Sequence, residues 1–310
     1  MIPAQVDPDL GVIVVTYRSG RHLDGCFAGL RSVAAPGAVV VVDSASPDDT
    51  LEVAAALWPE TTRLRMDDNL GYAAGVNAGL RLLSQPFVLV LNPDTRVDSS
   101  GLRAGLEWLR RHTEFGMLGP RLLGADGRPQ ASRLHEPTIP WAFRTYLARD
   151  AREAPPLAHV DGALEARVLA GAALLVRRDA CRAVGGMDEG FWLFSEEVDW
   201  CVRFRRAGYR LASLPGWTLT HLGGASTALL PVHHQAMVHR SRHRYFLKHH
   251  GRAAAGVFRL LLGLSLPWAA VIAAVNALLG RITWREAWRR VHAQAAALLS
   301  PGVSRPASRA

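Results

Sequence analysis

Residues 87–94 read FVLVLNPD, a run of five apolar residues that ends at Asn-Pro-Asp. An unbroken aliphatic run of this length is typical of a strand that is covered on both faces, as in a parallel sheet. Ligands of open α/β sheets bind just beyond the carboxyl ends of the strands. Asp94 stands at that position, where a carboxylate either completes a turn or a helix cap or binds a divalent metal. Taken alone, the stretch favours the structural role.

Strands and helices alternate on both sides of this stretch. Apolar runs predict strands at 11–17, 38–42, 62–66, 117–123, 170–176 and 210–214, and helical periods predict helices at 23–33, 51–57, 101–111 and 179–184. The alternation is typical of βαβ units with right-handed crossovers, so it predicts an α/β fold with a mostly parallel sheet. Residues 128–166 show neither pattern, and we expect a long loop there, for which a substrate lid is one interpretation.

The charge of the chain is concentrated near its end. The net charge is +9, but residues 240–310 hold 12 Lys and Arg against one acid, which leaves −2 for residues 1–239. This distribution argues against a nucleic-acid groove in the main domain, and it favours an anionic membrane surface as the partner of the basic end. Residues 1–10 show no signal-peptide pattern, and three cysteines without metal-ligand spacing argue against zinc, so we expect a cytoplasmic protein.

The basic end also contains an apolar stretch. Residues 260–280 carry no charge and are long enough to span a bilayer, yet arginines flank them on both sides, which does not orient a span. Trp284 and Trp288, one turn apart beside arginines, are typical of an interfacial helix. We expect a peripheral attachment to the cytoplasmic face of the plasma membrane. Packing of these helices on the enzyme's own sheet or on a second subunit, as a homodimer, stays open.

Residues 185–201, GGMDEGFWLFSEEVDWC, combine five acids with four aromatic residues. Buried carboxylates are costly unless they are paired or functional, and apolar surroundings raise the pKa of a carboxyl group. Glu196 and Glu197 fall in the first turn of an expected helix, where a carboxylate can also be a simple cap. We favour the catalytic interpretation over the cap.

Two further segments have a structural and a functional interpretation. Residues 67–79, DDNLGYAAGVNAG, space glycines four apart, which permits close packing on a neighbouring element or on a ligand. His221 is followed by two glycines and Ser226, which suggests a loop near a ligand, and histidine is a common metal ligand. A lone histidine is nevertheless more often structural.

Taken together, seven segments over residues 10–250 resemble the family-two GT-A glycosyltransferases, and most of all their rhamnosyltransferase-like branch. The segments are VIVVTYRS, VVVDSASPDDT, NLGYAAGVNAG, VLVLNPDT, LAGAALLVRR, VGGMDEGFWLFSEEVDWCVRFRRAGYR and THLGGAS, in the family's order. The resemblance implies a GT-A domain at 1–250, a mostly parallel Rossmann-like sheet flanked by helices, followed by a helical, apolar and basic extension at 251–310. It implies an inverting transferase that uses Mg²⁺ or Mn²⁺.

The resemblance also implies roles for individual residues. The donor-binding positions are Thr16, Tyr17, Asp43, Asn69, Gly71, Asn77, Asn92 and Asp94, and the metal ligands are Asp94 and His221. The general base is Glu197, with Asp188 and Glu196 as alternates, because this chain has Glu-Glu where the family has Glu-Asp. The acceptor-binding positions are Asp188, Trp192 and Gly171, and we expect Phe194 and Trp200 to line the sugar site beside Trp192.

The substrate class follows from the resemblance only in part. A dTDP-, UDP- or GDP-sugar is the expected donor, with rhamnose favoured, and a polysaccharide or lipid-linked glycan is the expected acceptor. A nucleotidyltransferase is one alternative, although residues 16–21 match its glycine-rich phosphate loop poorly. A catalytically decayed protein that still binds sugar nucleotides is the other.

Overall fold

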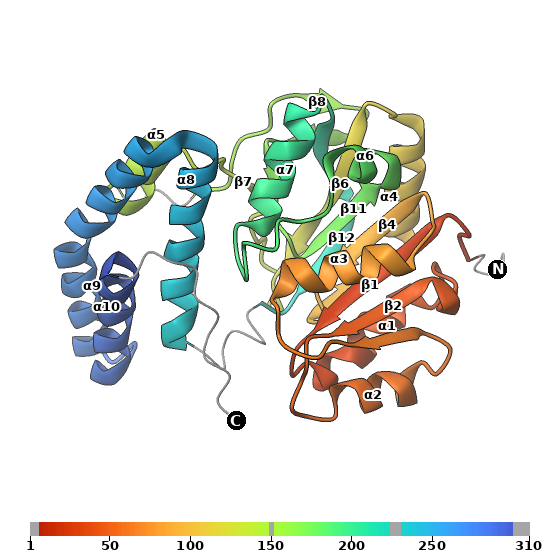
Figure 1. Ribbon diagram of the computed structural model, residues 1–310, viewed down its shortest axis with the longest axis horizontal. Helices are drawn as coiled ribbons and strands as arrows, with labels where there is room; N and C mark the ends of the chain where they lie inside the picture. Colours follow the sequence, from red (N-terminus) through yellow and green to blue (C-terminus); the bar gives the residue numbers. More distant parts are fainter. Residues whose placement is uncertain (1–5, 149–151, 224–230, 300–310) are drawn as a thin grey trace. The chain divides into compact units, whose positions relative to one another are not determined.

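The computed structural model describes residues 6–148, 152–223 and 231–299 (Figure 1). The chain divides into two compact units. The sheet unit comprises Met1–His135, Glu153–Glu189 and Glu196–Ser226, and the helical unit comprises Glu136–Arg152, Gly190–Ser195 and Thr227–Ala310. The helical unit therefore takes in segments that precede residue 251. The domain boundary expected there stays a prediction.

The sheet is organised around β4, Phe87–Leu91, all of whose residues are buried. The strand order is β3-β2-β1-β4-β11-β6-β12-β9-β8, with β5 paired to β12. The bounds are Leu10–Thr16 (β1), Val39–Asp43 (β2), Thr62–Arg65 (β3), Thr95–Val97 (β5), Phe115–Leu123 (β6), His159–Val160 (β8), Ala163–Glu165 (β9), Ala173–Arg177 (β11) and Arg210–His221 (β12). The mostly parallel α/β fold is confirmed.

One central strand runs against the others. β11 is antiparallel to both of its neighbours, β4 and β6, whereas β12 is parallel to β6. Two reversals restore the direction, so β1, β2, β4, β6 and β12 all point the same way. The amino end of β11 consequently lies at the edge where the parallel strands have their carboxyl ends.

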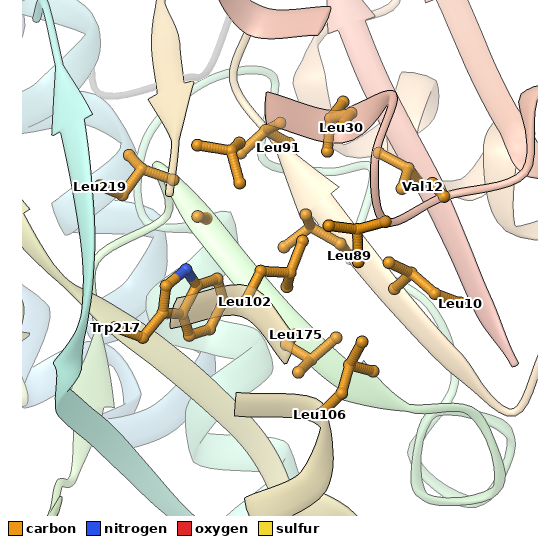
Figure 2. Close-up of a cluster of buried hydrophobic side chains, with 14 of the residues drawn as sticks. Leu10, Val12, Leu30, Leu89, Leu91, Leu102, Leu106, Leu175, Trp217 and Leu219 are labelled. Carbon is orange, nitrogen blue, oxygen red and sulfur yellow. The ribbon is translucent and has the colours of Figure 1, made fainter. Parts of the chain in front are cut away.

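The two faces of the sheet are covered because alternate strand residues point to opposite sides. Val12 and Leu89 belong to a cluster with Leu30 of α1 (Leu23–Leu30) and Leu102 of α4 (Ser99–Arg111), as Figure 2 shows. On the other face, α3 (Tyr72–Leu82) lies against β1 so closely that a Cβ on Gly75 would come 2.6 Å from Val15. The remaining helices of this unit are α2 (Thr50–Leu57), α6 (Arg178–Val184), α7 (Glu196–Arg206) and the short η1 (Gly20–His22) and η2 (Pro36–Ala38).

Residues 128–166 contain more structure than a loop. They form β7 (Arg133–Leu134), which pairs with β10 (Val168–Leu169), and they also contain β8, β9 and helix α5 (Ile139–Tyr146). Pro140 stands in the first turn of α5, and the side chain of Thr138 caps the helix by accepting from the backbone N–H of Trp141. Proline is well tolerated at that position, where its missing N–H would have no helical partner.

The helical unit consists of α5, α8 (Pro231–Leu264), α9 (Leu266–Leu278) and α10 (Trp284–Leu299). Phe246 and Phe258 of α8 stack on each other and pack with Ala142 of α5 in a small core. Gly251 interrupts α8 with a φ of 83°, and Ser265 separates α8 from α9. The uncharged stretch 260–280 is thus divided between two helices.

Within the described residues, one helical stretch, Ala236–Leu278, is long and apolar enough to cross a membrane by length and composition. Much of its apolar surface is open. Exposed residues of α8, α9 and α10 include Leu260, Leu264, Trp268, Val271, Leu278, Trp284 and Trp288. We call this set the apolar surface of the helical unit.

Candidate active site

Four candidate side chains stand at or just beyond the carboxyl ends of parallel strands. Thr16 ends β1, Asp43 ends β2, and His221 ends β12. Asp94 is the third residue after the end of β4. Because these strands point the same way, their carboxyl ends meet at one edge of the sheet, which we call the active edge. Residues scattered over more than 200 positions of the sequence are thereby gathered there.

Asp94 and His221 form a pair at this edge. The antiparallel pairing of β5 with β12 sets His221 opposite Thr95, the residue after Asp94. Nε2 of His221 lies 3.6 Å from Oδ1 of Asp94, and only 9% of the Asp94 side chain is exposed. A carboxylate oxygen and an imidazole nitrogen at this separation can both reach one divalent ion.

Gln130 orients the His221 ring. The amide oxygen Oε1 of Gln130 lies 2.9 Å from Nδ1 of His221, and Nε2 of Gln130 donates to the His221 carbonyl oxygen at 3.0 Å. Because an amide oxygen can only accept, Nδ1 donates to it, and the other ring nitrogen, Nε2, is the one near Asp94. A second hydrogen bond of this kind commonly orients a metal-binding histidine.

Glu197 reaches the same edge through the start of β11. A Cβ added to Gly171 would come within 3.2 Å of Cβ and Cγ of Glu197, so Glu197 packs directly on this glycine. The neighbouring Ala172 accepts a hydrogen bond at 2.9 Å from the backbone N–H of Asn92, in the turn that carries Asp94. One continuous set of contacts therefore links Glu197, Gly171, Asn92 and Asp94.

Glu196 differs from its neighbour in its surroundings. It is 5% exposed, and burial together with the charge of Glu197 raises the pKa of its carboxyl well above the usual value. Among the described residues, its Oε2 has no hydrogen-bond partner. Burial thus favours the protonated form of Glu196. Glu197, by contrast, is half-buried and lies against a glycine.

Asp43 joins two loops of the active edge. Its carboxylate accepts from Oγ1 of Thr16 at 3.0 Å and from both Oγ (2.5 Å) and N (2.9 Å) of Ser46, and Oγ of Ser46 in turn accepts from the N–H of Arg18. Thr16 and Asp43 are fully buried, whereas Tyr17 is half-buried. Asp43 therefore shapes the loops after β1 and β2. The direct contact of these residues with a nucleotide stays a prediction.

The start of α3 is built by Asn69 and Gly71. Gly71 has a φ of 93°, which favours glycine, and its N–H donates to Oδ1 of Asn69 at 3.1 Å. Asn77, further along α3, has a different task. Its amide donates to Met187 O and to Glu189 Oε1, and it accepts from Met187 N. Asn77 thus attaches the segment before Glu196 to the helix.

The acid and aromatic segment is divided by the structure. Asp188 is half-buried next to the Asn77 contacts, and Trp192 and Phe194 are half-buried in the part that belongs to the helical unit. Trp200 is fully buried, and its Nε1 donates to Gly185 O. The expectation that Trp200 lines the sugar site is wrong, because the other side of α7 carries it into the core beside Phe204.

Strained backbone gathers near the same residues. Within the described part of the chain, five non-glycine residues have φ between 45° and 68°, and four of them are in loops next to site residues: Arg18, Ala45, Phe194 and Ser195. Such conformations cost energy and tend to persist at functional sites.

Gln130, Tyr72 and Ser46 are site residues that sequence reasoning missed. Gln130 is 91 positions from its partner, and no local spacing could have found it.

A mostly parallel sheet flanked by helices, with acids and a histidine at its carboxyl edge, is the arrangement of the GT-A fold class. Among solved structures, the chain is similar to a mannosyltransferase from Pyrobaculum calidifontis in complex with GDP-Man and Mn²⁺, with a TM-score of 0.55, 16% identity and coverage of 96% of this chain and 87% of that one. This likeness supports the fold.

Sequence comparison identifies the family. The model of Glycosyl transferase family 2 matches residues 11–181, so the chain belongs to that family. It is 29% identical to N-acetylglucosaminyl-diphospho-decaprenol L-rhamnosyltransferase of Mycobacterium tuberculosis over 269 residues, 78% of this chain and 85% of the relative. It is 27% identical to the succinoglycan biosynthesis protein ExoA of Rhizobium meliloti over 302 residues, 94% and 84% of the two chains. The protein is a rhamnosyltransferase-like glycosyltransferase.

Proposed function

We propose that the protein is an inverting glycosyltransferase that moves a sugar, with rhamnose favoured, from a nucleotide-diphosphate donor to a hydroxyl of a polysaccharide or a lipid-linked glycan. One observation carries this proposal. The contact between Glu197 and Gly171, with the bond from Asn92 to Ala172, brings a carboxylate to the edge that Asp94 and His221 occupy. A base and a phosphate-facing site at one edge are what single displacement needs.

Glu197 takes the proton from the acceptor hydroxyl as its oxygen attacks the anomeric carbon from the side opposite the diphosphate. The bond from that carbon to the diphosphate breaks, and the nucleoside diphosphate leaves with the electron pair. The configuration at the anomeric carbon is inverted, because attack and departure occur on opposite faces. Glu196 is buried, and burial raises the pKa of its carboxyl, so it is not the base in this proposal.

Asp94 and His221 would hold the divalent ion, Mg²⁺ or Mn²⁺. Gln130 holds Nδ1 of His221 and leaves Nε2 near Asp94, an arrangement that fits a metal ligand better than a structural histidine. Within the described residues there is no group of three or more His, Cys, Asp and Glu that could hold a metal. Two protein ligands suit an ion that also binds substrate phosphates. When bound, the ion neutralises the charge that develops on the departing diphosphate.

The proposal is tested with the full chain and a panel of dTDP-L-rhamnose, UDP-N-acetylglucosamine and GDP-mannose, each with Mn²⁺ or Mg²⁺. We expect one donor to be hydrolysed slowly, and to be transferred faster when a polyprenyl-diphosphate-linked N-acetylglucosamine is added. Product of inverted configuration by NMR supports single displacement. Donor binding without hydrolysis or transfer would instead favour the catalytically decayed protein.

Gly171→Ala probes the position of Glu197. The added Cβ would meet Cβ and Cγ of Glu197 at 3.2 Å, closer than ordinary van der Waals contact, so the carboxylate must move by a few tenths of an ångström. Since a displaced base loses alignment with the hydroxyl, we expect kcat to fall about tenfold. Donor affinity, measured by calorimetry, should stay within about twofold of wild type. A normal kcat would show that the base is elsewhere.

The apolar surface of the helical unit supports attachment to an anionic membrane on its cytoplasmic face. Trp284 and Trp288 are 59% and 67% exposed. Exposed arginines accompany them: Arg252 and Arg259 of α8, Arg281 between α9 and α10, and Arg285 of α10. Glu286, the one acid of residues 240–310, accepts from Thr283 N and so is used in a capping box. Exposed aromatic rings beside arginines are typical of helices at an anionic interface.

Trp284→Ser/Trp288→Ser tests this attachment. We expect the full chain to co-sediment with phosphatidylglycerol vesicles, and the double variant to bind them at least about tenfold more weakly, because two tryptophans no longer enter the interface. Leu157→Ser, which changes an exposed leucine of the sheet unit, is the matched control. Equal sedimentation of the wild type and the double variant would exclude the attachment. Self-association without vesicles, measured by analytical ultracentrifugation, would favour the homodimer.

A further inference from the structure

Tyr72 is a buried polar group that the mechanism above does not use. It is the first residue of α3, directly after Gly71, whose left-handed backbone starts the helix. The ring is partly exposed, whereas the hydroxyl oxygen is buried. Among the described residues, that oxygen has no hydrogen-bond partner. A buried hydroxyl without a partner destabilises the folded protein, so its presence calls for an explanation.

The geometry of α3 carries Tyr72 to the active edge. Residues 72, 75 and 79 share one side of the helix, since their spacing follows the helical repeat. Gly75 and Gly79 on that side pack on Val15 and Ile13 of β1. Tyr72, one turn before Gly75, therefore lies where α3 extends past the end of β1. The hydroxyl thus stands at the edge that holds Asp94 and Glu197.

Electrostatics agree with this position. Burial raises the pKa of the Tyr72 hydroxyl, and the charges of Glu196, Glu197 and Asp94 raise it further. The hydroxyl therefore remains protonated and able to donate throughout the neutral range. Nearby Glu196 is 5% exposed, and its Oε2 likewise has no partner within the described residues. The Tyr72 hydroxyl and Oε2 of Glu196 thus have hydrogen-bonding capacity that no group in the described part of the chain uses.

We propose that the Tyr72 hydroxyl is a sugar-positioning group that donates a hydrogen bond to a hydroxyl of the pyranose bound between Asp94 and Glu197. This inference rests on the proposed glycosyl transfer and adds a substrate contact to it. A sugar is the ligand of matching chemistry, because its hydroxyls both donate and accept hydrogen bonds and can therefore pair with the tyrosine hydroxyl and with a buried carboxyl oxygen. The pyranose belongs either to the donor or to the acceptor.

Tyr72→Phe removes only the oxygen and keeps the ring. We expect kcat/KM for transfer to fall about tenfold, as for the loss of one substrate hydrogen bond at a buried polar site. The midpoint of thermal unfolding should stay equal or rise, because the lost oxygen has no partner in the described part of the protein. A hydroxyl with a structural role would instead lower the unfolding temperature. Tyr209→Phe is the matched control, because Tyr209 directly precedes β12, at the end of the strand opposite to His221.

The assay separates the two sources of the sugar. Each substrate is varied while the other is saturating, and calorimetry compares the nucleotide sugar with the bare nucleoside diphosphate. A higher donor KM with unchanged binding of the bare nucleotide assigns the contact to the donor sugar, and a higher acceptor KM assigns it to the acceptor. Either result supports the inference.

Two outcomes overturn the inference in different ways. A wild-type protein that transfers sugar while Tyr72→Phe matches it in every constant removes the inference and leaves the proposed function standing. A wild type that neither binds nor turns over any sugar nucleotide removes both. A fall in activity that only parallels a lower unfolding temperature also overturns the positioning role.

Discussion

Glu197→Gln is expected to lower kcat for sugar transfer about a thousandfold while leaving donor affinity within about twofold of wild type. The amide keeps the size of the side chain and its packing on Gly171, but it cannot accept the proton of the acceptor hydroxyl. The loss therefore falls on the chemical step and not on binding. Initial rates with saturating substrates give kcat, and calorimetry with the nucleotide sugar and Mn²⁺ gives the affinity.

Glu196→Gln is the matched comparison, because it makes the same chemical change one residue away. Burial and the charge of Glu197 raise the pKa of Glu196 and favour its protonated form, which an uncharged amide resembles. We expect a loss of less than about tenfold. A larger loss for Glu196→Gln than for Glu197→Gln would make Glu196 the base. Near-normal turnover in both variants would leave Asp188 as the remaining candidate.

The same shift has a consequence for stability. Below the unfolded pKa the Glu196 carboxyl is protonated in both the folded and the unfolded chain, so its ionisation does not change the free energy of unfolding there. As pH rises from the unfolded pKa toward the folded pKa, the free energy of unfolding falls, because the unfolded chain gains a solvated charge that the folded chain lacks. The stability of Glu196→Gln relative to wild type should therefore be greater in alkaline buffer than in acidic buffer. Unfolding midpoints across pH check this sign.

Asp94→Asn is expected to weaken Mn²⁺-dependent donor binding on the order of a hundredfold. The amide removes the negative charge from the pair with His221, whose Nε2 lies 3.6 Å away. Without metal, Asp94→Asn should bind the donor more tightly than wild type does, because its neutral side chain no longer repels the diphosphate. Calorimetry with the nucleotide sugar, in Mn²⁺ and in EDTA, measures both arms.

Asp98→Asn is the matched control for Asp94→Asn. Asp98 is four residues along the chain, where its side chain caps α4 by accepting from Ser100 N, and it has no part in the proposed metal site. Its substitution should lower the unfolding temperature slightly and leave donor affinity unchanged. Equal donor affinity for Asp94→Asn and wild type in Mn²⁺ would contradict the metal assignment.

Much of the fold could be read from local patterns. The unbroken runs that became β1, β2 and β4 are apolar because both faces of those strands are covered, and that signal is contained within five to seven residues. The direction of β11 was not predictable. Its run Ala173–Arg177 has the same composition whether it lies parallel or antiparallel to β4. Helix α5 was not predicted either. Its buried residues pack against α8, which is far along the chain and belongs to the core of the helical unit.

The candidate site divides in the same way. Asp43, Asp94 and His221 could be chosen from sequence because each follows an expected strand or a motif of the family. The tasks of Asn77 and Trp200 could not. Asn77 binds residues 110 and 112 positions away, and Trp200 is on the buried side of α7, beside the acids but turned away from the active edge.

The sequence by itself determined which segments form the parallel strands and which polar side chains stand at their ends, since hydrophobic periodicity and turn chemistry are properties of neighbouring residues. Only the tertiary structure decided that Gln130 orients His221, that Gly171 supports Glu197 and that the Tyr72 hydroxyl is left without a protein partner among the described residues. Those facts depend on strand order and on contacts between distant parts of the chain. No local pattern predicts these contacts, because the sequence around each residue does not depend on which distant residue it meets.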